Sequence, residues 1–294
     1  MLIYSLIRID KINSLRIKDE REVESRDYST EKMLKQVKVG FIGFGNMAMA
    51  LCDGWLETNT LNGHQMFACA NNFSKLQDNC KKRGIQPCHD SFEVVQNSDV
   101  IILAVKPYMI EDVVKPIRHK LGEKIVVSVA ACYNYEKYIN IFDKGTHFIS
   151  TIPNTPVSVG EGVIVCENKH TLTESQLTLF EQLFQSIALV ECVGTHQLSV
   201  AGTISGCGPA FVNMFIEALG DAGVKYGLTR DMAYRLASQM IVGTGKMQMV
   251  TQKHPGTLKD AVCSPGGTTI KGVTKLEEEG FRNAVIKAID AIEG

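Results

Sequence analysis

Long hydrophobic runs are missing from this chain of 294 residues. The uninterrupted apolar stretches are short, as at residues 100–105, whereas a membrane-spanning helix needs about 20 apolar residues. The sequence therefore predicts a protein that does not span a membrane. Aromatic residues are also few, at 7%, but the hydrophobic share of 45% is that of a globular protein with a sizeable core.

An excess of charge of either sign is missing as well, since 31 Lys and Arg face 32 Asp and Glu. This balance gives no global basic field, so we expect neither a nucleic-acid partner nor an anionic membrane surface. The nine cysteines lack paired C-x-x-C spacing, and their odd number without a secretory signal favours reduced thiols in the cytoplasm. No His/Cys cluster predicts a metal site.

The first 35 residues differ from the rest, because they carry many charges of both signs and neither Gly nor Pro. We interpret residues 1–35 as a flexible extension, with Met33 as a second possible start. The alternative is a transit peptide, since residues 1–18 are basic and contain a single acid. That alternative would indicate a mitochondrial location, although the acidic residues 19–22 weaken it.

A glycine-rich motif follows the first apolar, β-branched strand, expected at residues 37–42, and opens a helix. Its first glycine permits a tight turn, its second lets the backbone approach a pyrophosphate, and its small last residue allows close helix packing. The helix N-terminus adds amide donors. The sequence therefore predicts dinucleotide binding, and the motif consists of Gly43, Phe44, Gly45, Asn46, Met47 and Ala48.

The second strand, expected at residues 65–70, ends without an acid, and none occurs between Thr58 and Gln77. An NAD site usually places Asp or Glu here on the ribose hydroxyls. Asn71 and Asn72 follow instead, with Ser74 and Lys75, and such groups suit a 2′-phosphate. This favours NADPH, with NADH as the alternative if the segment is an ordinary polar turn.

Further strands at residues 100–105, 124–131 and 147–152 alternate with helices, which predicts an α/β fold with a doubly wound parallel sheet of Rossmann type. Strands at 160–166 and 187–192 extend it, around a helix at 173–185. Ligands bind at the carboxyl ends of such strands. The segments expected on the nicotinamide side contain Ala104, Val105, Lys106, Pro107, Ala131 and Asn154. Lys106 is a candidate acid, although a role in holding phosphate or helix ends is preferred.

From about residue 196 the strand pattern disappears and three or four helices are expected. We therefore divide the chain into an extension (1–35), a nucleotide-binding domain (36–195) and an all-α domain (196–294). A helical unit of about 100 residues this apolar is short of a core of its own, and an intertwined dimer is one solution.

Near the C-terminus, Pro and Gly punctuate the chain before a helix that is expected to run toward Ile292. The Gly-Gly-Thr-Thr sequence at residues 266–269 admits two interpretations. The first is a cradle of amides and hydroxyls for a carboxylate. The second is a capping turn with Thr268 or Thr269 as the N-cap. The physical chemistry of the sequence leaves the two open.

These motifs, in this order over residues 37–290, make the chain resemble the pyrroline-5-carboxylate reductase family. The matching segments are Phe41-Ile42-Gly43-Phe44-Gly45-Asn46-Met47-Ala48, Ala104-Val105-Lys106-Pro107, Pro153-Asn154-Thr155-Pro156, Ser205-Gly206-Cys207-Gly208-Pro209-Ala210 and Val262-Cys263-Ser264-Pro265-Gly266-Gly267-Thr268-Thr269. The resemblance implies reduction of the C=N bond of 1-pyrroline-5-carboxylate to L-proline, the last step of proline biosynthesis. It also implies a homo-oligomer of intertwined dimers.

The resemblance also implies roles for individual residues. Residues 43–48 would hold the pyrophosphate, and Asn71 and Asn72 would lie near the adenosine ribose. Thr269 would act on the imine nitrogen. The residues implied in substrate binding are Gln252, Ser264, Gly266, Gly267, Thr268 and Thr269.

Two other classes of function compete with this interpretation. One is a related imine or β-hydroxyacid reductase, for which Lys246 would be the candidate general acid. The other is a non-catalytic NADP-sensing protein, which would bind the cofactor without turnover.

Overall fold

The computed structural model describes residues 33–131 and 133–294. The interpretation of residues 1–32 as an extension therefore lies outside the described residues, as does Cys132. The chain forms two compact units, of which the first ends at Gly206 and the second comprises Cys207–Gly294. Each unit is described by itself below.

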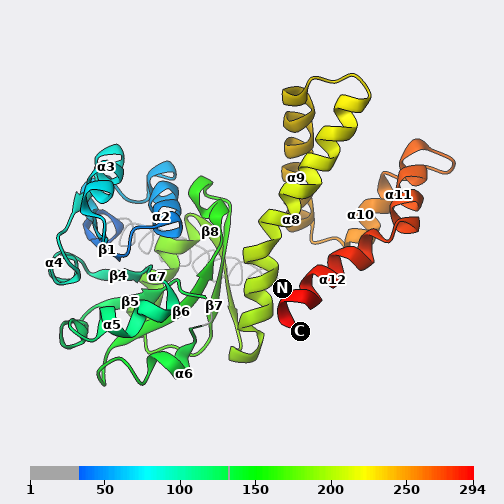
Figure 1. Ribbon diagram of the computed structural model, residues 1–294. Helices are drawn as coiled ribbons and strands as arrows, with labels where there is room; N and C mark the ends of the chain where they lie inside the picture. The colour runs from blue at the N-terminus through cyan, green and yellow to red at the C-terminus, as the bar shows by residue number, and fades with distance from the viewer. Residues whose placement is uncertain (1–32, 132) are drawn as a thin grey trace, which may run out of the picture. The chain divides into compact units, whose positions relative to one another are not determined.

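The first unit is built on an eight-stranded sheet with the order β3-β2-β1-β4-β5-β6-β7-β8 (Figure 1). The strands are β1 (Val39–Ile42), β2 (Met66–Cys69), β3 (Gln86–Pro87), β4 (Val100–Leu103), β5 (Ile125–Ser128), β6 (His147–Pro153), β7 (Gly162–Glu167) and β8 (Ala188–Val193). Strand β1 lies between β2 and β4, which is the order of a Rossmann fold. The predicted fold class is confirmed.

One strand pair departs from the expected parallel sheet, because β7 runs antiparallel to β6. Only the short 3-10 turn η4 (Thr155–Val159) lies between the two strands. Such a connection cannot carry the chain back across the sheet, as a parallel neighbour requires. Helix α7 follows β7 and provides that crossover, so β8 is again parallel to β7.

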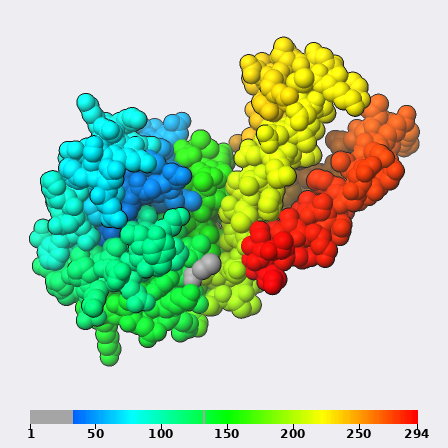
Figure 2. Space-filling model, viewed as in Figure 1, coloured from blue at the N-terminus to red at the C-terminus, as the bar shows by residue number. Residues whose placement is uncertain are grey.

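Helices cover both faces of this sheet. One face is covered by α2 (Asn46–Glu57), α3 (Phe73–Arg83) and α7 (Glu174–Gln185), and the other by α4 (Ser91–Asn97), α5 (Ile110–Val114) and α6 (Tyr135–Tyr138). Trp55 on α2 is fully buried, and its indole nitrogen donates a hydrogen bond to the Leu183 carbonyl on α7 over 2.8 Å. The blue-to-green residues form one continuous packed body in Figure 2.

The second unit is all helical within its described residues, as predicted. Five helices occur after residue 196, one more than expected: α8 (Leu198–Lys225), α9 (Arg230–Thr251), α10 (Pro255–Ala261), α11 (Thr268–Glu278) and α12 (Phe281–Glu293). Helix α8 begins in the first unit. The single helix expected beyond residue 268 is divided because Gly280 adopts a left-handed φ of +76°, which ends α11 before α12 starts.

The end of α8 and the start of α9 form a hairpin with close helix contacts (Figure 1). A Cβ atom at Gly223 would lie 2.8 Å from the Ala233 side chain. The same pair of helices is joined by an ion pair of 2.5 Å between Arg230 and Asp221. Small residues therefore set the approach of the two helices.

By length and composition, one helix of the described chain, Thr195–Lys225, is apolar enough to cross a membrane. The expectation that the chain has no span rested on uninterrupted runs, and Gly, Ser and Thr interrupt the apolar residues of this helix. A single helix of this kind is weak evidence, because the core helix of a globular protein has the same composition.

Candidate active site

The predicted cofactor residues follow strands that end at the same edge of the sheet. Strands β1, β2, β4, β5 and β6 are parallel to one another. Their carboxyl ends lead into the segments that contain Gly43, Asn71, Ala104, Ala131 and Asn154. Ligands of doubly wound sheets bind at this edge, beside the strand where the order reverses. The topology thus brings these five segments together.

The glycine turn after β1 has the backbone that a dinucleotide motif requires. Gly43 has a φ of +88°, and a Cβ there would lie 2.7 Å from the Ala104 carbonyl oxygen. Its amide donates to the Cys69 carbonyl over 3.0 Å, which ties the turn to β2. By contrast, a Cβ at Gly45 would meet nothing within 4 Å. The space above Gly45 is open, so a pyrophosphate fits against this turn.

Helix α2 starts at this turn with its first amides unused. Its N-cap, Gly45, makes no side-chain cap, and the first turn carries no acid. Asn46 is exposed, whereas Ala48 is fully buried and Phe44 nearly so. The side chain of Phe44 therefore belongs to the core, and the residue offers its backbone to a ligand. Unused amides at a helix N-terminus favour an anion.

The segment after β2 caps the next helix. The Asn72 side-chain oxygen accepts a hydrogen bond from the Lys75 amide over 3.0 Å, so Asn72 is the N-cap of α3. The first turn of α3 has no acid, and Asn71, Ser74 and Lys75 are exposed. This surface carries a positive charge and helix amides where a 2′-phosphate would sit. The capping role of Asn72 was not predicted.

Asn154, at the end of β6, uses its side chain within the protein. Its Oδ1 accepts a hydrogen bond from the Val163 amide over 2.8 Å, and its Nδ2 donates to the Ser205 carbonyl over 3.0 Å. The residue is almost fully buried. It ties the start of β7 to the interior of α8 beside the predicted nicotinamide edge. A cofactor that contacts the Asn154 side chain would therefore have to use the same two atoms, Oδ1 and Nδ2, that already make these bonds.

The segment after β4, residues 104–107, leaves the Lys106 amine in solvent. Lys106 is exposed and precedes Pro107, the first residue of the 3-10 turn η2 (Pro107–Met109). Ala104 and Val105 are half-buried, and Ala131 is exposed. An exposed Lys106 suits a phosphate contact better than a role as a buried acid.

Two features of this edge were missed from the sequence. Phe73, next to Asn72, stacks on His89 with a centroid distance of 4.4 Å. His89 follows β3, so only the fold brings the two rings together. Cys69 lies at the end of β2, and burial raises the pKa of its thiol to about 11. It therefore stays neutral and adds no negative charge near the predicted phosphate site.

The turn at residues 264–267 in the second unit has a defined geometry. The Gly267 amide donates to the Ser264 carbonyl over 3.0 Å, and Gly266 has a φ of +68°. With Pro265 before it, this is the arrangement of a type II β-turn, in which glycine supplies the positive φ. A side chain at Gly267 would overlap Ser264. Gly266 is thus required by its backbone angle, whereas Gly267 leaves room for the Ser264 side chain.

Gly267, and neither threonine, is the N-cap of α11, and no side chain caps this helix. The capping interpretation of Thr268 and Thr269 is therefore wrong, because both already have helical backbone angles as the first residues of α11. Their hydroxyls and the first amides of the helix remain available to a ligand. Gln252, also predicted at the substrate, is the C-cap of α9 with a φ of +51°.

These features define the class: an oxidoreductase with a Rossmann-type unit for an NADP-type cofactor and a separate helical unit. Residues 38–132 match the family model described as NADP oxidoreductase, coenzyme F420-dependent. Residues 195–293 match the model described as pyrroline-5-carboxylate reductase dimerisation. Within the described residues, no His, Cys, Asp and Glu side chains are grouped to hold a metal ion.

Similar proteins identify the family. Pyrroline-5-carboxylate reductase of Treponema pallidum is 44% identical over 259 residues, covering 87% of this chain and 98% of the relative. A crystal structure of Plasmodium falciparum pyrroline carboxylate reductase with NADP bound has a TM-score of 0.78 at 30% identity, covering 88% and 96% of the two chains. A Coxiella burnetii pyrroline-5-carboxylate reductase has a TM-score of 0.77, also at 30% identity, with the same coverage. The chain belongs to the pyrroline-5-carboxylate reductase family.

Proposed function

We propose that this protein catalyses the NAD(P)H-dependent reduction of 1-pyrroline-5-carboxylate to L-proline, the final step of proline biosynthesis. The observation that carries the proposal is the start of α11. There a tight turn presents two threonine hydroxyls and unused helix amides, within the region that matches the reductase dimerisation model. A carboxylate beside a ring nitrogen is a ligand that such a site fits.

The cofactor, when bound, supplies a hydride to the imine carbon. The amides of residues 45–48 hold its pyrophosphate, since they are unused at the N-terminus of α2. Asn71 and Lys75 hold the 2′-phosphate, because they are exposed at a helix start without an acid. NADPH is thus preferred over NADH. Lys106 contacts phosphate at the nicotinamide side, and Ala104, Val105, Pro107, Ala131 and Asn154 shape that side.

Thr269 orients the imine nitrogen through its hydroxyl. A threonine hydroxyl is too weak an acid to protonate the imine by itself, so it positions the nitrogen and relays a proton from water. The amides of residues 264–269 hold the substrate carboxylate, and Thr268 and Gln252 add polar contacts. Most of the acceleration then comes from holding the nicotinamide and pyrroline rings in contact and from the fixed dipoles of the amides and hydroxyls around them.

The protein acts as a homo-oligomer built from intertwined dimers. Large apolar side chains of the second unit are exposed in the single chain, among them Val212, Met214, Leu236, Met240, Val242, Met247, Met249, Val250, Val285 and Ile286. Exposed apolar surface of this extent marks a contact with another subunit. The apolar character of α8 is explained in the same way, without a membrane. A cytoplasmic location stays a prediction.

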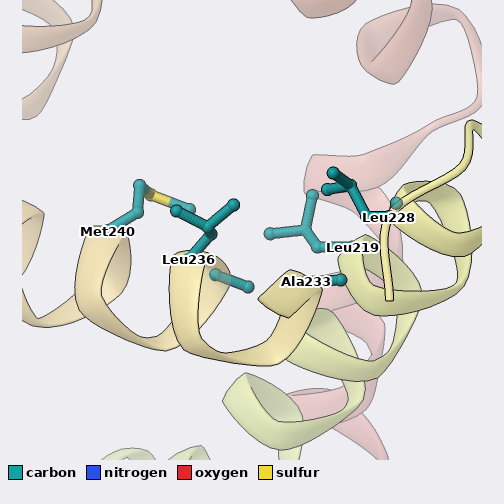
Figure 3. Close-up of a pocket in the computed structure, with 7 residues that line it drawn as sticks. Leu219, Leu228, Ala233, Leu236 and Met240 are labelled. Atoms are coloured by element: carbon teal, nitrogen blue, oxygen red, sulfur yellow. The ribbon is translucent and has the colours of Figure 1, made fainter. Parts of the chain in front are cut away.

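Part of this surface is a groove between α8 and α9 with a volume of about 310 Å³. Figure 3 shows Leu219, Leu228 and Leu236 pointing toward one another across it. Its lining is apolar throughout: Leu219, Gly223, Leu228, Ala233, Leu236, Ala237 and Met240. An open groove of this kind lets a second copy bury leucine side chains that the single chain leaves partly in water.

The deciding experiment measures NADPH oxidation with pyrroline-5-carboxylate for the wild type, Thr269→Ala and Thr269→Ser. We expect kcat/KM to fall roughly 10²-fold in Thr269→Ala, because a contact with the reacting nitrogen is lost. Thr269→Ser keeps the hydroxyl and should retain most of the activity. NADPH affinity, measured by fluorescence titration, should be unchanged in both variants. The same assay with NADH should be slower.

Three outcomes would contradict parts of the proposal. Full activity of Thr269→Ala would keep the reaction and remove the role of Thr269. NADPH binding without turnover in the wild type would indicate an NADP-sensing protein or a related substrate. If only a β-hydroxyacid were turned over, Lys246, which is exposed on α9, would become the candidate acid. Faster turnover with NADH would remove the 2′-phosphate argument.

A further inference from the structure

Two cysteines lie opposite each other on neighbouring strands at one end of the sheet. Cys166 on β7 is the register partner of Cys192 on β8 in a parallel pair. Neighbouring strands are about 4.8 Å apart, and disulfides span Cα separations of about 4.4 to 6.8 Å. Register partners of parallel strands project to the same face. The backbone therefore places the two sulfur atoms within reach of one bond.

Solvent reaches the two thiols unequally. Cys166 is fully buried in the core under α7, in the same cluster as Ile164. Cys192 is exposed, because β8 is the outermost strand and no further strand covers it. A reagent in solution can therefore attack Cys192 while Cys166 stays protected behind it.

The more exposed thiol, Cys192, is also the more acidic of the two. The Cys166 thiol has two acceptors in reach, the Ile164 carbonyl at 3.9 Å and the sulfur of Cys192. Hydrogen bonding from Cys166 lowers the pKa of Cys192 to about 7, against burial and the negative charges of Glu181 on α7 and Glu191 on β8. The donor itself is buried, and both effects raise the pKa of Cys166. Burial is the largest effect at four other cysteines and raises their pKa to about 11 or 12: Cys52, Cys69, Cys80 and Cys88. Of the two thiols, Cys192 is thus the one that ionises more readily.

We propose that Cys192 and Cys166 form a redox-active pair that a hydroperoxide converts into a disulfide between β7 and β8. The Cys192 thiolate attacks the terminal peroxide oxygen, the O–O bond breaks, and the other oxygen leaves as hydroxide or alkoxide, which takes up a proton to form water or an alcohol. Cys192 is then a sulfenic acid, and the peroxide has been reduced by two electrons. The sulfur of Cys166 attacks that of Cys192, the S–O bond breaks, and the hydroxyl leaves with the Cys166 proton as water. Two molecules of a small thiol reduce the disulfide by exchange: the first forms a mixed disulfide and frees one cysteine, and the second frees the other and leaves joined to the first as their own disulfide.

The test uses the reduced full-length protein with hydrogen peroxide and does not depend on reductase activity. Peptide mapping by mass spectrometry should find one new cross-link, between the peptides of residues 166 and 192, which dithiothreitol removes. Cys166→Ala keeps a small apolar residue in the core and should accumulate a sulfenic acid on Cys192 that dimedone traps. Cys192→Ser should give no cross-link. Cys207→Ser removes a half-buried thiol on α8 and should leave the reaction unchanged.

A pH profile separates this role from a purely structural one. Alkylation of Cys192 by iodoacetamide should have its midpoint near pH 7 in the wild type. In Cys166→Ala the midpoint should move toward the ordinary cysteine value of about 8.5, because the donor is lost, and the rate at pH 7 should fall roughly tenfold. Equal midpoints in the two proteins, or oxidation of other cysteines before Cys192, would overturn the proposal.

Discussion

The two units of this chain treat apolar side chains in opposite ways. In the first unit they fill two continuous clusters, one on each face of the sheet. In the described part of the second unit, Ala233 and Ala237 are the buried hydrophobic residues, whereas Val250 is 75% exposed and Met214 67%. The second unit is as rich in apolar residues as the first, so what it lacks is a surface to cover them. The first unit has a complete core of its own, and we propose that the second completes its core with another copy.

The largest effect should come from opening the core of the first unit. Trp55→Ala removes a fully buried side chain and leaves the Leu183 carbonyl without its donor. We expect a loss of about 3 to 5 kcal/mol in the free energy of unfolding. Since Trp55 is the one tryptophan of the chain, unfolding in urea is followed by circular dichroism. Tyr226→Ala, at a side chain 81% exposed in the second unit and outside the lining of the groove, is the comparison and should cost far less. Equal losses would remove the contrast between the units.

The next effect should appear in the subunit number. Leu236→Glu places a charge in the groove between α8 and α9, at a side chain that is 58% exposed. On a free surface such a change alters stability by about 0.5 kcal/mol at most, whereas at a subunit contact it should weaken association at least ~100-fold. Size-exclusion chromatography with light scattering measures the mass.

The matched control for that variant is Val159→Glu, at a side chain 64% exposed in the first unit. We expect Val159→Glu to keep the mass of the wild type while Leu236→Glu becomes monomeric. If both variants kept the wild-type mass, the groove would not lie at the subunit contact, and the second unit would have to be stable with its apolar side chains in water.

Seven of the eight strands of the first unit could be predicted from the sequence, because β-branched residues and glycine turns mark them. The two-residue strand β3 was missed, since it is too short to show a pattern. The expected strand at residues 147–152 and the observed β6 differ by one residue. The direction of β7 could not be read, since a hydrophobic pattern is the same for either direction. The break at Gly280 was missed because a single glycine within a helical pattern is usually tolerated.

For the candidate site too, the sequence located local motifs but could not predict contacts between distant residues. Its glycine motifs are local, so the sequence located them, and the turn angles of Gly43 and Gly266 agree with the roles assigned to them. The capping by Gly267 depends on a backbone angle that the sequence did not fix. The bonds of Asn154 reach Val163 and Ser205, which only the folded chain brings near.

The two units also differ in how they join distant segments through polar groups. In the first unit the buried carboxylate of Glu167 accepts hydrogen bonds from the Tyr135 amide over 2.6 Å and from the Thr195 hydroxyl over 2.5 Å. Glu167→Gln keeps an acceptor for the Tyr135 amide but removes the charge that strengthens both bonds, and the Thr195 hydroxyl has to turn to accept from the new amide. We expect a loss of about 2 kcal/mol in unfolding free energy, measured by urea denaturation.

The control for this comparison is the exposed ion pair of the second unit. Asp221→Asn breaks its bond to Arg230, at a carboxylate that is 73% exposed. Solvent already screens this pair, so the loss should be about 0.5 kcal/mol or less. A larger loss for Asp221→Asn than for Glu167→Gln would mean that burial does not set the strength of these links.

The smallest effect concerns the backbone. Each unit holds one described residue other than glycine with a positive φ: Asn59 at 56° in the first and Gln252 at 51° in the second. Asparagine tolerates this region through local hydrogen bonds, whereas glutamine does not, so only Gln252 should carry appreciable strain. We expect Gln252→Gly to raise the unfolding free energy by about 0.5 to 1 kcal/mol, and Asn59→Gly to change it less. Thermal melting measures both. If Gln252 also contacts the substrate, Gln252→Gly will raise the KM for pyrroline-5-carboxylate as well as the melting temperature. A fall in the melting temperature would show that the glutamine side chain, rather than its backbone, stabilises the end of α9.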